Sequence, residues 1–198
     1  MDLAFSGKDE LTKDHDLTIV CKDGVKLHVH SLIMSKWSEV FGALPAVRDK
    51  VMESVRTSEI TVEEESAAWR ELLGLIYPVS PLTILEWESV GRIFDLADKY
   101  NMPGVLERCE AFLMSTRNGL SSYEQDNNYA LKWLAFAAKY NQRKLHEKCM
   151  QYIRLSYRSI DELRCPREGG VLKSELAAMP SGVDCIVEIL SFVMQQRR

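Results

Sequence analysis

The chain has few of the features that indicate catalysis, metal binding or membrane insertion. Its five cysteines are odd in number and include no C-x-x-C pair, so neither a disulfide framework nor a zinc site is expected. His28 and His30 share a strand face, but no third ligand follows nearby. We expect His28 to be exposed on the polar face and His30 to be hydrogen-bonded at the strand-to-helix corner. No hydrophobic run approaches the roughly 20 residues that a membrane span needs.

Sequence motifs of enzymes are also missing. There is no G-x-S-x-G, no phosphate-binding P-loop and no H-E-x-x-H pattern, so we expect no enzyme and no cofactor. The first residues, "MDLAFSGKDELTKDHD", carry acids and lack the basic-then-apolar order of a signal peptide. Free thiols suit a reducing compartment, and we therefore expect a cytoplasmic or nuclear location.

Charge is distributed unevenly along a chain of ordinary globular composition. The sequence is 46% hydrophobic and 27% charged, with a net charge of −4. Residues 1–115 hold 12 basic and 20 acidic side chains, and residues 116–198 hold 13 and 9. The basic second part is compatible with a nucleic-acid face or a solvated helical surface. We favour the solvated surface, because the basic residues are scattered without interleaved aromatics.

The segment "DLTIVCKDGVKLHV", residues 16–29, predicts a β-hairpin around its Asp-Gly turn. A two-residue loop would put Ile19 on the opposite face from Leu27. A three-residue loop pairs Ile19 with Leu27, collects the apolar side chains on one face, and places Gly24 where the loop needs a left-handed residue. We therefore predict the three-residue loop.

Later segments predict an α+β fold with an all-helical end. Ser31 is a candidate N-cap for a helix over 31–44, with a core stripe at Ile33, Trp37, Val40, Phe41 and Leu44. Alternation predicts a strand at 59–62, and apolar spacing predicts helices from residue 65 onward, interrupted by prolines and a polar linker after residue 115. Strands early and helices late define the predicted fold class.

One block occurs twice, as "ADKYNMPGVLERC" at residues 97–109 and "AAKYNQRKLHEKC" at residues 137–149. Six positions are identical at a spacing of 40 residues, and Arg108 is matched by Lys148. The tyrosine and the cysteine of each copy stand nine residues apart, on opposite arms of a predicted helical hairpin. We expect the cysteines to be buried core residues, because a free thiol behaves as a small hydrophobe.

The ordered set of elements resembles a BTB/POZ domain. Asp16 leads the hairpin, His30 ends its second strand, and Ser38 and Phe41 follow eight and eleven residues later. "WRELLGLIYP" and "IFDLADKYNMPGVLERCEAFL" resemble the helices that close such a domain. The resemblance implies that Asp16, Gly24, His30, Ser38 and Phe41 have architectural roles in the fold. "YPVSP", residues 77–81, departs from the Gly-containing turn that is usual there.

The resemblance implies a domain organisation. We predict a leader at residues 1–13, a BTB/POZ domain at 14–115, a linker at 116–127 and a helical extension at 128–198. The extension resembles the BACK-like region that often follows a BTB domain, on the basis of "LAAMPSGVDCIVEILSFV" at residues 176–193. No kelch, MATH or zinc-finger pattern is recognisable in the 198 residues.

Members of this family commonly form homodimers through the N-terminal segment and the first helix. Leu3 and Phe5 are apolar residues in a polar leader and are candidates for such an interface. Leu32 and Met34 lie off the main apolar stripe of the first predicted helix. They face either a partner or the core of the same chain, and the sequence leaves both alternatives open.

Many family members bind the N-terminal helices of cullin-3 and act as substrate adaptors of a ubiquitin ligase. In those adaptors an apolar residue, any residue and a glutamate precede the third strand. Val51, Met52 and Glu53 fit this pattern, although so short a motif also arises by chance. The resemblance thus implies a non-enzymatic, homodimerising adaptor with an unidentified protein substrate. The alternative is an oligomerisation scaffold or transcriptional co-regulator without cullin binding.

Overall fold

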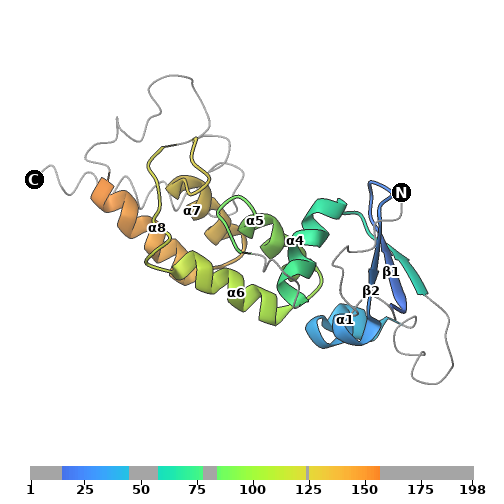
Figure 1. Cartoon of the computed structure of the whole chain (residues 1–198). Coiled ribbons are helices and arrows are strands. Elements are labelled where there is room, and N and C mark those ends of the chain that lie inside the picture. The colour runs from blue at the N-terminus through green and yellow to red at the C-terminus, as the bar shows by residue number, and fades with distance from the viewer. Residues whose placement is uncertain (1–14, 45–57, 78–83, 124, 157–198) are drawn as a thin grey trace, which may run out of the picture. The chain divides into compact units, whose positions relative to one another are not determined.

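The computed structural model describes residues 15–44, 58–77, 84–123 and 125–156. The chain divides into two compact units, residues 1–111 and 112–198. The first unit combines a small sheet with helices, and the described part of the second is helical (Figure 1). The predicted α+β class is confirmed. Among the described residues, no helix is long and apolar enough to span a membrane.

The sheet has three strands, β1 (Leu17–Val20), β2 (Lys26–Val29) and β3 (Ser58–Thr61), in the order β2-β1-β3. β1 pairs antiparallel with β2 and parallel with β3. Ile19 stands opposite Leu27, as the three-residue loop requires, so the predicted register is confirmed. Both side chains are fully buried, because the alternation of the hairpin directs its apolar residues to one face.

The loop of the hairpin contacts the N-terminus of helix α4. The backbone N–H of Cys21 donates to the carbonyl of Val25 at 2.9 Å, and Gly24 adopts a φ of 75°. A left-handed residue is needed there, which only glycine supplies without strain. The carboxylate of Asp23 accepts from the hydroxyl and N–H of Ser66, at 2.7 and 3.2 Å. The loop thereby caps the first turn of helix α4.

The prediction of one helix over 31–44 is wrong, because the chain breaks at Ser38. Helices α1 (Ser31–Trp37) and α2 (Glu39–Ala43) are separated there by one extended residue. The Ser38 hydroxyl accepts from the N–H of Phe41 at 3.1 Å and so caps α2. The break changes which side chains face the core, so that Phe41 is buried and Val40 is 38% exposed.

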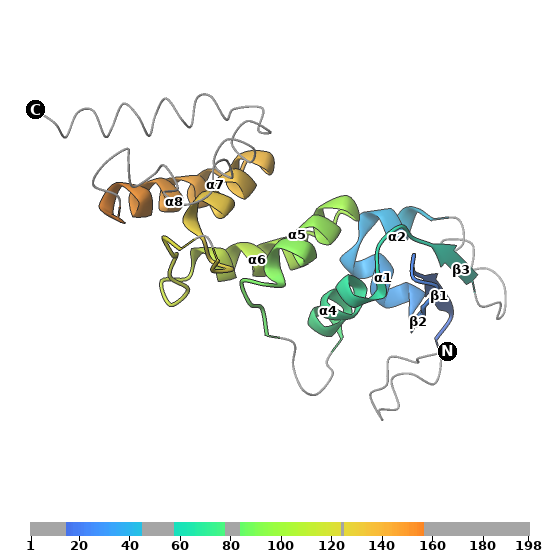
Figure 2. The same cartoon turned by 90° about the horizontal axis from the view of Figure 1, so that it is seen from above.

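Three longer helices complete the first unit, α4 (Ser66–Ile76), α5 (Val90–Lys99) and the first part of α6 (Pro103–Met114). Helices α1, α2 and α4 lie on one side of the sheet (Figures 1 and 2). The core between them is apolar and aromatic, and its largest fully buried side chains include Leu17, Ile19, Leu27, Met34, Phe41, Trp69, Leu72 and Ile93.

Pro103 and Gly104 form the first turn of α6. Proline suits the first helical position, because its missing N–H has no partner there. A Cβ atom at position 104 would lie 2.8 Å from the ring of Trp37, so glycine permits the close approach of α1. The guanidinium of Arg108 stands 5.2 Å from the centroid of the same ring. Gly104 therefore serves helix packing.

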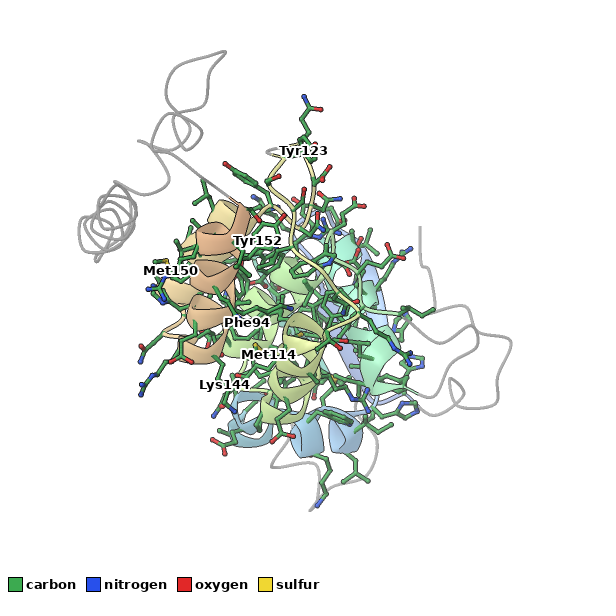
Figure 3. All side chains as sticks on the ribbon, turned by 90° about the vertical axis from the view of Figure 1, so that its left-hand side faces the viewer. Phe94, Met114, Tyr123, Lys144, Met150 and Tyr152 are labelled. Carbon is green, nitrogen blue, oxygen red and sulfur yellow. The ribbon has the colours of Figure 1, made fainter. Side chains whose placement is uncertain are left out.

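The second unit contains a helical hairpin, α7 (Ala130–Lys139) and α8 (Arg143–Ser156), whose arms lie side by side (Figure 2). A polar loop precedes it, in which Ser121 bridges to Tyr129 and the indole N–H of Trp133 donates to the Asn127 carbonyl at 2.7 Å. Tyr123 is 73% exposed and projects at the outer end of this loop (Figure 3).

The repeated block has the same backbone conformation in both copies. Asn101 and Asn141 are the two described non-glycine residues with positive φ, at 47° and 52°. The N–H of the residue after each asparagine donates to an alanine carbonyl five residues earlier, at 2.8 and 2.7 Å. Each asparagine therefore ends a helix with a left-handed residue and starts the next arm.

A side-chain hydrogen bond is also repeated at the spacing of 40 residues. Arg108 donates to the carbonyl of Leu75, and Lys148 donates to the carbonyl of Ser115 at 3.1 Å. In both copies a cation satisfies a carbonyl at the C-terminal end of an earlier helix. Lys148 also donates to two neighbouring carbonyls, those of Leu113 at 2.5 Å and Asn118 at 3.1 Å. The block therefore preserves packing geometry as well as sequence.

Removing the hydroxyl of Ser38 should destabilise the first unit. Ser38→Ala removes the cap of α2 and leaves the partly buried carbonyl of Tyr100 without this donor, so we expect a loss of about 2 kcal/mol in the free energy of unfolding. Urea denaturation measures it. Ser35→Ala is the control, since that exposed hydroxyl bonds only within α1, and its effect should stay within about 0.5 kcal/mol. Equal losses of stability in the two variants would contradict a special role for the Ser38 hydroxyl.

Cys109 and Cys149, the two cysteines of the repeated block, should not react with alkylating reagents in the folded chain. Cys109 and Cys149 are both 0% exposed, which confirms their predicted burial, and burial raises the pKa of each thiol to about 12. Very little thiolate, the reactive form, exists near neutral pH. We expect iodoacetamide to modify neither residue at pH 8 without denaturant and both in urea, as read by peptide mass spectrometry. Rapid native labelling would show that these thiols are accessible.

Candidate protein-interaction site

The corner between the sheet and α1 is built around the carboxylate of Asp16. Its two oxygens accept from the N–H of Ser31 at 2.7 Å and from the Ser31 hydroxyl at 2.5 Å. Ser31 is the first residue of α1, and the N-cap position belongs to His30, whose side chain makes no capping bond. The predicted N-cap role of Ser31 is therefore wrong. The Asp16 carboxylate, at the start of the hairpin, instead accepts from a free N–H at the N-terminus of α1. Its negative charge also interacts favourably with the positive end of the helix dipole.

Tyr77 holds the same corner from the other side. The backbone N–H of His30 donates to its phenolic oxygen at 2.9 Å, and the Nδ1 atom of His30 lies 3.3 Å from that oxygen. Burial, together with the negative charge of Asp16, raises the pKa of Tyr77 to about 12, so the phenol stays neutral. Asp16, His30 and Tyr77 thus fix the direction in which α1 leaves the sheet.

The two predicted interface residues of α1 lie on different faces. Leu32 is 69% exposed, whereas Met34 is 0% exposed and belongs to the core. Ser31 and Met34 are one helical turn apart and share the inward face of α1. Met34 is therefore removed from the candidate interface, and the alternative that it fills the core of the same chain is the correct one.

Other predicted interface residues lie outside the described residues. These are Leu3 and Phe5 of the leader and the motif Val51, Met52 and Glu53. In the described part of the first unit, large apolar side chains that reach the surface are Leu32, Val40 and Ile84, the last at 78% exposure. Sequence periodicity placed Val40 in the core. The signal that would have corrected it is Ser38 followed by Glu39, a capping pair within a helical pattern.

Ser38 and Phe41 hold α2 against the turn at Tyr100. The Ser38 hydroxyl donates to the carbonyl of Tyr100 at 2.5 Å, and the Asn101 amide donates to the carboxylate of Glu39 at 2.6 Å. The ring centroids of Phe41 and Tyr100 are 5.4 Å apart. Ser38 and Phe41, for which the sequence predicted architectural roles, therefore hold α2 in place. Val40 of α2 and Leu32 of the neighbouring α1 remain exposed.

A small charged cluster lies where the loop before α4 meets the end of α5. The carboxylate of Glu64 accepts from the ammonium of Lys99 at 2.5 Å and from the phenol of Tyr100 at 3.0 Å. Partial burial opposes the ionisation of Glu64, but these two donors hold its pKa below the usual range. The cluster joins the loop before α4 to the end of α5. Its groups are paired with one another within the first unit.

The histidines of the hairpin are separated by their partners. His28 lies 3.1 Å from the Thr18 hydroxyl, and its ring centroid is 4.3 Å from that of His15. His30 is engaged with Tyr77 at the corner. Across the part of the chain that the structure describes, no group of three or more His, Cys, Asp or Glu residues is arranged to hold a metal ion. His28 and His30 therefore both have partners within the first unit.

Comparisons with known proteins agree with this geometry. The family model for the BTB/POZ domain matches residues 7–117. BTB and MATH domain-containing protein 38 of Caenorhabditis elegans is 28% identical over 142 residues, which cover 70% of this chain and 32% of that relative. The chain thus spans about a third of the length of the curated relative that it matches.

The match covers more than half of the chain and includes the sheet, the Asp16 corner and the helices from α1 to α6. The chain therefore belongs to the BTB/POZ domain family and carries its protein-interaction module.

Proposed function

We propose that the chain is a homodimerising adaptor that links a cullin-3-type scaffold to a protein substrate. The observation that carries the proposal is the BTB/POZ domain at residues 7–117, since this family typically acts without catalysis by binding other proteins. We place the adaptor in the cytoplasm or the nucleus. The free, buried Cys21, Cys109 and Cys149 suit the reducing conditions of both.

Self-association would use the outward face of α1. Leu32 exposes 69% of its surface next to Ser31, which the Asp16 carboxylate holds in place. A large apolar side chain on a fixed backbone loses little conformational entropy when a partner covers it. In a two-fold dimer each such contact occurs twice, so one residue contributes doubly. We propose that Leu3 and Phe5 of the leader add to the same interface.

Cullin binding would use the segment between α2 and β3. Val51, Met52 and Glu53 lie between Ala43, the last residue of α2, and Ser58, the first residue of β3. Both ends of the segment are thus attached to the rigid first unit. We propose that Val51 enters an apolar pocket of the cullin and that Glu53 gives the contact its charge complementarity.

Substrate binding would fall to residues 128–198, for which we propose a BACK-like extension. Leu155 in its described part is 79% exposed, and Tyr123 of the preceding linker is 73% exposed. Exposed tyrosines are frequent anchors of protein interfaces. Dimerisation through the first unit would present two such extensions to one substrate, which raises the effective affinity by avidity.

Replacing Glu53 should abolish cullin binding without unfolding the chain. We expect wild type to retain a cullin-3 N-terminal domain in a pull-down and Glu53→Lys to retain at least about tenfold less, because a charge-reversed contact repels its partner. Glu88→Lys is the matched control, with the same charge change at an exposed position beside α5. Absence of binding by wild type would exclude the adaptor and favour a scaffold or co-regulator without cullin.

Replacing Leu32 should dissociate the dimer. Leu32→Asp puts a carboxylate into an apolar contact twice, and we expect the dimer dissociation constant to rise by at least about a hundredfold. Light scattering at micromolar concentration reports the mass. Ile84→Asp, at an equally exposed position, should leave the mass unchanged. A wild-type monomer, or a Leu32→Asp variant that remains fully dimeric, would contradict this interface.

A further inference from the structure

Positive charge is concentrated in the helical hairpin of the second unit. Helices α7 and α8 hold six basic side chains and one carboxylate, a net charge of +5. Helices α5 and α6, which contain the first copy of the repeated block, hold three basic and four acidic side chains. Residues 157–198 hold six of each kind. The excess positive charge of the second unit therefore lies in this hairpin.

The two copies of the repeat differ in charge in one direction only. At the spacing of 40 residues, three carboxylates of the first hairpin have uncharged counterparts, with Asp95 replaced by Ala135, Asp98 by Ala138 and Glu110 by Met150. Three uncharged residues have cationic counterparts, with Pro103 replaced by Arg143, Gly104 by Lys144 and Met114 by Arg154. Both turns have the same backbone conformation, so the hairpin fold does not require these cations.

Helix stability does not explain the added cations either. Arg143 and Lys144 are the first two residues of α8, and no acidic side chain occupies its first turn. The helix dipole is positive at this end, so cations there are unfavourable for the helix. The first copy has Pro103 at the equivalent position, which suits a helix start. A partner of opposite charge would account for basic residues that folding does not need.

The exposed side of α8 carries these cations together with an apolar side chain. We call this side the outer face, and its exposed residues are Arg143, Lys144, Glu147, Gln151, Arg154 and Leu155. Lys144, Gln151 and Leu155 share one stripe of the helix, because they follow at intervals of seven and four positions. Lys144 makes no hydrogen bond or ion pair with another described residue. Leu155 is 79% exposed.

The one carboxylate of the outer face is already paired. Arg143 donates to Glu147 at 3.1 Å, and the two side chains are 89% and 63% exposed. An ion pair in water contributes little, so Arg143 can exchange this contact for a carboxylate of a partner. Glu147 would repel a phosphate backbone, and Leu155 offers an apolar contact that such a backbone does not use. The outer face therefore fits a protein segment better than a nucleic acid.

We propose that the outer face of α8 binds an acidic segment of a partner protein, with carboxylates at Arg143 and Lys144 and an aliphatic side chain at Leu155. Lys144 and Leu155 are eleven positions apart, which is about 16 Å along the helix. The acidic and aliphatic residues of the segment must match this separation. The inference rests on the proposed function, in which the second unit binds the substrate, and it names the chemical class of that substrate.

The first test uses a labelled helical peptide of about 14 residues, the length of α8, with two glutamates about 16 Å from a leucine on one face. Its control has glutamine in place of each glutamate. Fluorescence anisotropy with the full chain should show at least about tenfold tighter binding of the glutamate peptide, weakening as salt screens the ion pairs. Equal affinities would overturn the proposal. Tighter binding of double-stranded DNA would also overturn it, in favour of a nucleic-acid face.

The second test locates the binding face with charge and apolar variants. We expect Lys144→Glu to weaken binding of the glutamate peptide at least about tenfold, because attraction becomes repulsion. Lys22→Glu makes the same change at an exposed position of the first unit and should leave the affinity unchanged. Leu155→Asn should weaken binding about tenfold, and the equally exposed Ile84→Asn should not. Equal losses in a variant and its control would overturn the proposal.

The cullin pull-down, repeated on the same samples, separates this inference from the adaptor proposal. Lys144→Glu and Leu155→Asn should retain the cullin fragment as wild type does, since both positions lie in the second unit. Peptide binding by a wild-type chain that retains no cullin would support the outer face and contradict the adaptor. Cullin binding without peptide binding would overturn the outer face as the binding site and leave the adaptor proposal in place.

Discussion

The start of α2 is held on the turn at Tyr100 and Asn101 by three hydrogen bonds, and the packing of the first unit depends on them. They join residues 62 positions apart, so they close the unit between its β-rich beginning and its last helical hairpin. The same contact ends α1 at Trp37 and turns Phe41 into the core. It thereby decides which apolar side chains remain outside for a partner.

A protein-interaction module needs a surface that keeps its shape when a partner binds. The Asp16 carboxylate and the Tyr77 phenol hold the beginning of α1, and the Tyr100 turn holds the beginning of α2. Partly buried hydrogen bonds of this kind resist rearrangement, because a lost partner leaves a polar group poorly satisfied. The exposed Leu32 therefore stands on a backbone fixed at both ends. This rigidity, together with family membership, supports binding as the function of the domain.

Local sequence patterns predicted those features that short-range physics determines. The hairpin register followed from alternation and from Gly24, and the burial of Cys109 and Cys149 followed from the repeated block. The break at Ser38 was missed, because apolar residues continue at helical spacing through it. The local sign of the break is the capping pair Ser38 and Glu39, whereas its distant partner, the carbonyl of Tyr100, cannot be read from the sequence near Ser38. The burial of Met34 was undecided for a similar reason, since it depends on how α1 meets the sheet.

We propose that the domain dimerises and binds a cullin at the same time. The most direct measurement is the mass of the complex formed when the full chain is mixed with a cullin-3 N-terminal domain, by light scattering coupled to size exclusion. The account predicts a complex of two chains and two cullin fragments. Two separate peaks, or a complex with a single copy of the chain, would contradict it.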